Sequence, residues 1–213
     1  KLDSNSDRVI VLDSRAKAIF LLENQTVQDS VTLEQDNYFK MMVTNNSQII
    51  VMNDNAARIF EANGDSLIRI KFEDGFSGED IMLQDPLLYI LTSNSASNQS
   101  QIITYNRASQ QITHLNLTGN FTLIDKPVDK NYLYLSEVIN SNSTRLVKLS
   151  LVGNRLLELP VLTGNIDDVA INQYDNSIIV LQRYQNNLVL YDSLGQIVST
   201  NNQIYDPIKI SIQ

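Results

Sequence analysis

The apolar residues of this chain recur in short runs that come in pairs. A run of β-branched and apolar residues leads into a polar turn, and a second apolar run follows, as in Val9–Ser14 with Ala18–Leu21. The same arrangement returns four more times, with a period of about 40 residues. Short strands repeated at this period are typical of β-propeller blades. The five first runs are centred on Val11, Val51, Ile90, Tyr134 and Val180.

Each repeat divides further into four short strands, most clearly in the fifth repeat. The runs are β-branched or aromatic and are bounded by clusters of Asn, Asp, Ser and Gly, which are strand and turn signals. Gly195 lies in the turn before the last strand, where a positive φ is expected. No segment keeps the apolar spacing of a helix over three turns. The predicted strands of this repeat are Asp168–Asn172, Ser177–Gln182, Leu188–Asp192 and Gln196–Thr200.

The two ends of the chain suggest how the repeats form a ring. We expect the first repeat to lack an inner strand of its own, because no apolar run precedes Val9–Asp13. The C-terminal run Ile208–Ile212 resembles the inner strands Phe39–Val43 and Asp168–Ile171. We therefore expect an all-β, five-bladed β-propeller of four-stranded antiparallel blades, closed by the C-terminal strand, which removes two open sheet edges. The alternative is a five-repeat portion of a larger ring.

This interpretation treats residues 1–213 as a single propeller domain. Its expected blades are blade 1 at 8–34 plus 206–213, blade 2 at 36–72, blade 3 at 78–117, blade 4 at 119–160 and blade 5 at 165–201.

Two of the repeats resemble a known class of propeller sequence. The segments Val11–Phe20 and Val51–Phe60 each carry a strand, an Asp-Ser or Asp-Asn turn and an Ile-centred next strand, and look like repeats of the NHL or YVTN type. The fifth copy has Gln182-Arg183 in place of the turn signature. The resemblance implies a domain that presents loops for binding, and it carries over no catalytic residue.

Composition narrows the classes of partner. A net charge of -8 and an isoelectric point near 4.6 argue against a nucleic-acid interface, which needs a basic face. No apolar stretch approaches the roughly 18 residues of a membrane span, so direct membrane insertion is not expected. The chain has no cysteine, which excludes disulfides and thiolate chemistry. Abundant Asn, Ser and Thr with little Lys favour an extracytoplasmic or cell-surface location.

Acidic and amide side chains stand where the predicted inner strands begin. If these strands surround a central axis, their first residues ring one mouth of the tunnel. Such oxygen ligands are of the kind that hold Ca²⁺, and two spaced carboxylates are the machinery of glycoside hydrolysis. Short polar residues are also what turns require, so a structural role stays open beside both. The candidate residues are Asp36, Glu79, Asp80, Asn120, Asp167, Asp168 and Asp206.

No other pattern points to a reaction. His114 is the single histidine and falls on a predicted outer strand, away from any axis. The glycines form no phosphate-binding loop. We therefore expect a non-enzymatic binding, sensor or scaffold propeller within a larger exported or membrane-anchored protein, with a protein or small ligand as partner. The alternatives are a carbohydrate-binding, lectin-like propeller and a carboxylate hydrolase acting at the tunnel mouth.

Overall fold

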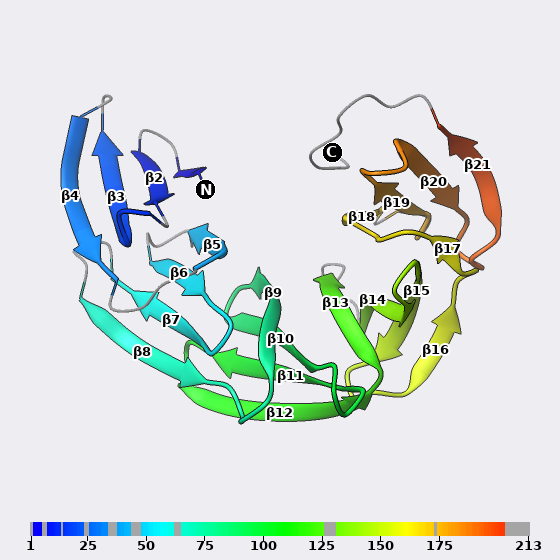
Figure 1. The fold of residues 1–213 in the computed structure, drawn as a ribbon, viewed down its shortest axis with the longest axis horizontal. Coiled ribbons are helices and arrows are strands. Elements are labelled where there is room, and N and C mark those ends of the chain that lie inside the picture. Colours follow the sequence, from blue (N-terminus) through cyan, green and yellow to red (C-terminus); the bar gives the residue numbers. More distant parts are fainter. Residues whose placement is uncertain are drawn as a thin grey trace.

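The computed structural model shows an all-β protein built from five antiparallel sheets. The structure describes residues 2–5, 8–13, 15–23, 26–33, 38–43, 48–61, 65–125, 131–172 and 174–202. Within these residues there is no helix, and therefore no helical segment able to cross a membrane. The five sheets follow one another along an arc, with the first and the fifth at its two ends (Figure 1). All-β architecture and repeated four-stranded antiparallel sheets are thus confirmed, and they are compatible with a β-propeller.

Each sheet is a meander in which strands adjacent in sequence pair with one another. The first sheet contains β1 (Leu2–Asn5), β2 (Arg8–Asp13), β3 (Ala18–Glu23) and β4 (Thr26–Thr32). The second contains β5 (Lys40–Val43), β6 (Ile49–Met52), β7 (Ala56–Phe60) and β8 (Ser66–Lys71). The third contains β9 (Ser77–Gln84), β10 (Leu87–Asn94), β11 (Gln99–Asn106) and β12 (Gln111–Thr118).

The last two sheets repeat this order. The fourth contains β13 (Asn120–Asp125), β14 (Tyr132–Asn140), β15 (Ser143–Ser150) and β16 (Arg155–Glu158), with β17 (Leu162–Thr163) as an additional partner of β15. The fifth contains β18 (Asp168–Ile171), β19 (Ile178–Gln182), β20 (Asn187–Tyr191) and β21 (Ile197–Asn201). The first strand of each sheet lies on the inside of the arc and β4, β8, β12, β16 and β21 lie on the outside (Figure 1).

The first sheet corrects the expectation about the missing inner strand. β1 pairs with β2 along the edge that the C-terminal run was expected to occupy, with Leu2 opposite Val11 and Asn5 opposite Arg8. The first repeat therefore has four strands of its own. Leu2 is the single apolar residue of β1, so an apolar-run criterion does not detect a strand that is held by backbone hydrogen bonds. Residues 206–213, the predicted closing strand, lie outside the described residues.

The hydrophobic core lies between successive sheets and not within one central cluster. Side chains alternate along a strand, so Tyr89 and Leu91 pack toward the fourth sheet while Leu88 and Ile90 pack toward the second. Both faces of β10 are therefore buried, which explains its nearly unbroken apolar run. The outer strands are largely exposed, and β21 is exposed throughout.

A turn glycine shows how closely neighbouring sheets approach. Gly195, in the turn between β20 and β21, has the expected positive φ of 81°. A Cβ at this position would stand 2.5 Å from a methyl carbon of Leu159, on the preceding sheet. The turn signal found in the sequence thus also marks a contact between the fourth and fifth sheets.

Candidate functional site

The pairing registers place the predicted site residues that the structure describes at the same end of the sheets, where the first strand of each sheet begins. Because neighbouring strands are antiparallel, the start of the first strand lies beside the end of the second, as Ser77 beside Ser93 and Asp168 beside Leu181. We call this edge, where β5, β9, β13 and β18 begin, the start face, and the edge where they end the end face. The start face therefore also carries the β10–β11 and β14–β15 turns.

Asp80, on the third sheet, makes contacts with both neighbouring sheets. Its side chain is buried, and Oδ1 lies 2.8 Å from Nζ of Lys40 on the second sheet. Oδ2 accepts a hydrogen bond of 3.2 Å from the backbone N–H of Ile124 on the fourth sheet. A buried carboxylate with an ion pair and a backbone donor is a structural fastener, and both of its oxygens are occupied.

Glu79 lies beside Asp80 in a less favourable environment. It is half-buried, and the Ser93 hydroxyl donates a hydrogen bond to its Oε1. Burial raises the pKa of Glu79, and the charges of Asp54 and Asp80 raise it further against the opposing effects of the Ser93 hydrogen bond and Lys40. The start face therefore contains one carboxylate that is easier to protonate than an ordinary glutamate.

Asp167 supports a turn of the fifth sheet. Its Oδ2 accepts a hydrogen bond of 2.6 Å from the backbone N–H of Arg183, directly after β19. In the first two sheets this turn is held by the residue at its own start, since Asp13 and Asn53 each accept two backbone N–H groups. The Asp-Ser signature that is missing at Gln182-Arg183 is thus replaced by a carboxylate from another part of the repeat.

The remaining predicted residues lie in different settings. Asp168 is partly buried at the start of β18. Asn120, at the start of β13, has a buried side-chain oxygen that finds no hydrogen-bond partner within the described part of the chain. Asp36 and Asp206 fall outside the described residues.

The structure brings some of the predicted acids together and leaves others apart. Asp80 and Asp54 lie close enough to Glu79 to raise its pKa, whereas Asp167 is engaged in its own turn of the fifth sheet. Among the residues that the structure describes, no three acidic or histidine side chains converge as the ligands of a metal ion would. Calcium binding at this face remains a prediction from sequence.

A charged network on the start face was not anticipated. Glu137, at 6% exposure, forms ion pairs with Arg145 and Arg155, and both arginines also bind Glu158. Burial by itself would raise the pKa of Glu137, but the hydrogen bonds and charges of Arg155 and Arg145 outweigh it and hold the pKa below its usual range. The available signal was the register of the β14–β15 hairpin, which sets Glu137 opposite Arg145.

His114 is exposed on the outer strand β12, where the sequence placed it. Its Nδ1 lies 3.0 Å from the side-chain oxygen of Gln101, whose amide nitrogen donates to Glu73 and Asn116. Because the Gln101 oxygen is an acceptor, His114 Nδ1 carries the proton in this arrangement.

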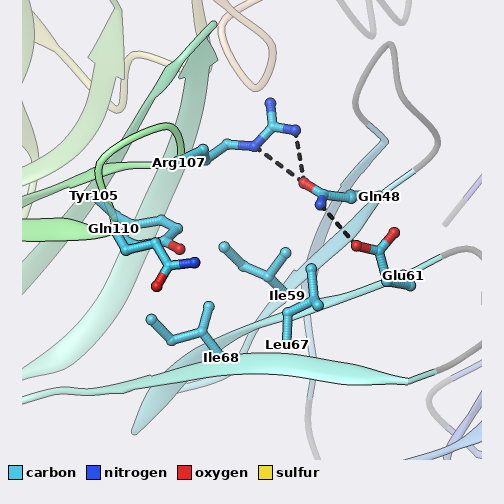
Figure 2. A pocket seen from close by; sticks show the side chains of 8 residues that line it. All are labelled: Gln48, Ile59, Glu61, Leu67, Ile68, Tyr105, Arg107 and Gln110. Atoms are coloured by element: carbon cyan, nitrogen blue, oxygen red, sulfur yellow. Dashed lines mark hydrogen bonds between the residues drawn. The ribbon is translucent and has the colours of Figure 1, made fainter.

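A pocket opens on the end face between the second and third sheets, far along the strands from the predicted site. Figure 2 shows its lining residues, with Gln48 and Glu61 on one side, Tyr105 and Gln110 on the other, and the aliphatic side chains between them. Its volume is about 230 Å³. None of its residues was singled out from the sequence, because they come from four separate segments. They are Gln48, Ile59, Glu61, Leu67, Ile68, Tyr105, Arg107 and Gln110.

No family model and no curated protein matches this sequence. Solved structures do match, 502 chains in all. One is a protein of unknown function from Bacteroides caccae, with a crystal structure at 1.35 Å resolution. It is 15% identical to this chain at a TM-score of 0.71, and the match covers 92% of this chain and 73% of that one. At this identity the likeness shows a shared fold and nothing about activity.

Proposed function

We propose that the chain is a five-bladed β-propeller of the NHL-like kind that serves as a non-enzymatic binding or scaffold module. Its recognition surface is the start face, and its partner is a protein or a small ligand. The proposal includes an extracytoplasmic or cell-surface location within a larger protein, as the composition suggests.

The main support for this proposal is that acidic groups on the start face make structural contacts within the protein. Asp80 and Asp167, two of the predicted mouth carboxylates, are engaged with an ammonium group or with backbone N–H groups. Their role is to hold strands and turns in place. This arrangement favours a rigid presenting surface over a carboxylate pair that would have to exchange protons with a substrate.

The turns between second and third strands complete the surface. In the β10–β11 turn, Asn94 accepts a hydrogen bond of 3.2 Å from the backbone N–H of Ser97, and in the β14–β15 turn Asn140 accepts one of 2.9 Å from that of Asn142. The tip residues Ser95 and Ser141 are exposed. A turn that is already ordered loses little conformational entropy on binding, which favours recognition by these tips.

Two arrays of defined probes, one of glycans and one of peptides, test the proposal. The start-face variant is Ser95→Lys with Ser141→Lys, and the matched end-face variant is Val152→Lys with Ser193→Lys, all at exposed turn positions. We expect a bound probe whose affinity falls at least about tenfold in the start-face variant and is kept in the end-face variant.

Two results would contradict this function. One is a set of bound probes that are all insensitive to the start-face variant. The other is a chemical change in a probe after incubation, detected by mass spectrometry, which would support the hydrolase alternative instead.

A further inference from the structure

The end-face pocket has a rim whose polar groups are fixed by one another. Arg107 forms an ion pair with Asp85, with 2.6 Å between Nη1 and Oδ1. Its Nε and Nη2 donate to the side-chain oxygen of Gln48 at 3.1 and 2.6 Å, and the Gln48 amide donates to Glu61 Oε1 at 3.1 Å. The contacts from Arg107 through Gln48 to Glu61, drawn as dashed lines in Figure 2, join the third sheet to the second. The rim is therefore preorganised before any ligand arrives.

Two groups on the pocket wall have hydrogen-bonding capacity to spare. Within the described residues, Glu61 accepts one side-chain hydrogen bond, which Gln48 donates to its Oε1 atom. Gln110 is exposed and has a positive φ of 59°, and its side-chain amide turns toward the pocket (Figure 2). Within the described part of the chain that amide makes no hydrogen bond. The wall thus offers a carboxylate acceptor and an amide that both donates and accepts.

The surface between Glu61 and Gln110 is apolar (Figure 2). Leu67 and Ile68 form this surface above the buried Ile59, and the ring of Tyr105 lies next to Gln110. At about 230 Å³ the pocket is smaller than the roughly 300–1,000 Å³ of sites for drug-sized ligands. It has the size for a single small unit with one apolar face and several polar edges.

We propose that this pocket binds one residue of a carbohydrate. The C–H face of the sugar packs on Leu67 and Ile68, and its hydroxyl groups bond to Glu61 and Gln110. A hydroxyl both donates and accepts, so it suits a wall that pairs a carboxylate with an amide. An anion is disfavoured, because Asp85 balances the charge of Arg107 and Glu61 stands on the wall. This site lies on the face opposite the recognition surface proposed above and does not depend on it.

The experiment titrates isotope-labelled protein with methyl glycosides of glucose, galactose and mannose and with N-acetylglucosamine. Backbone amide shifts are followed by NMR. We expect saturable shifts at Ile59, Leu67, Ile68 and Tyr105, with a millimolar Kd that does not change with salt. Gln110→Gly removes the amide while suiting the positive φ, and we expect it to raise Kd about three- to tenfold, the value of one hydrogen bond.

A matched control uses the same change on the other face. Asn98 is also an exposed turn residue with positive φ, 52°, on the start face, and Asn98→Gly is expected to leave the sugar Kd unchanged. Three results would overturn the proposal: no saturable shift at the pocket with any glycoside, a Kd that is unchanged in Gln110→Gly, or a salt-sensitive response to n-butylamine without a response to glycosides. If sugars shift start-face amides and Asn98→Gly abolishes that shift, the start-face proposal gains support while the pocket proposal fails.

Discussion

The two faces of the same five sheets use their polar side chains differently. On the start face, the acidic side chains bind groups of the protein itself. Asp80 binds an ammonium group, Asp167 a backbone N–H group and Glu137 a guanidinium group. On the end face, the rim from Asp85 to Glu61 is equally well connected, but it borders a pocket that an aliphatic surface completes. The acids of the start face therefore hold strands and turns in place, whereas the fixed polar groups of the end face border apolar surface, a combination that is common in ligand sites.

The largest effect that tests this contrast is expected at Glu137. Glu137→Ala leaves Arg145 and Arg155 without their shared buried partner, and removing one member of such a network costs about 3 kcal/mol or more of unfolding free energy. Chemical denaturation measures the loss. The matched change Glu158→Ala removes a partner at 39% side-chain exposure, where about 0–1 kcal/mol is expected. Equal losses in the two variants would show that Glu137 is not the buried centre of the network.

The next effect is expected at Asp80. Asp80→Asn keeps the shape of the side chain but weakens the bonds to Lys40 and to the Ile124 N–H, so we expect a loss of about 1–3 kcal/mol. Asp74→Asn, at an exposed position of the same face, should change the unfolding free energy by less than about 0.5 kcal/mol. If Asp80→Asn is as well tolerated as Asp74→Asn, the carboxylate does not fasten the sheets and a ligand role regains weight.

Two glutamates of the start face should respond to pH with opposite sign. The pKa of Glu137 is lowered on folding, so its contribution is present above the pKa of the unfolded chain and is lost as pH falls through the folded pKa. The pKa of Glu79 is raised, so its contribution is present below the unfolded pKa and is lost as pH rises through the folded pKa.

The sign expected for Glu79 is checked by measuring the free energy of unfolding from acidic pH, below the unfolded pKa of this group, up to neutral pH. Glu79→Gln should stabilise the protein at neutral pH, because it removes a half-buried charge beside Asp54 and Asp80, and the gain should vanish in acid. A variant that is destabilised at neutral pH would mean that the Glu79 carboxylate has a favourable partner in its charged form.

The smallest effect on stability is expected on the end face. Gln110→Gly should change the unfolding free energy by less than about 0.5 kcal/mol, because the side chain is exposed and glycine tolerates the positive φ. The comparison of faces predicts that this residue matters for ligand affinity and not for folding. A loss above about 1 kcal/mol would place Gln110 among the structural residues instead.

The strands were predictable because each depends on local pattern. β10 and β19 are apolar runs buried on both faces, and Gly195 sits in the turn that its sequence signals. β1 was missed because its strand character comes from pairing with β2 and not from its own side chains. The site was only partly predictable. The sequence identified Glu79 and Asp80 as neighbours, but it gave no sign that Asp80 contacts the sheets on both sides of its own.

The sequence determined the strand pattern and the polar character of the strand starts, because hydrophobic periodicity and turn chemistry act over a few residues. The tertiary structure decided which polar groups meet. Arg107 binds Gln48 from 59 positions away, and Asp80 binds the N–H of Ile124 from 44 positions away. Such contacts depend on the stacking of neighbouring sheets, which follows from the packing of both faces of every sheet and not from any local signal. For the same reason, the end-face pocket became visible only when the second and third sheets were placed side by side.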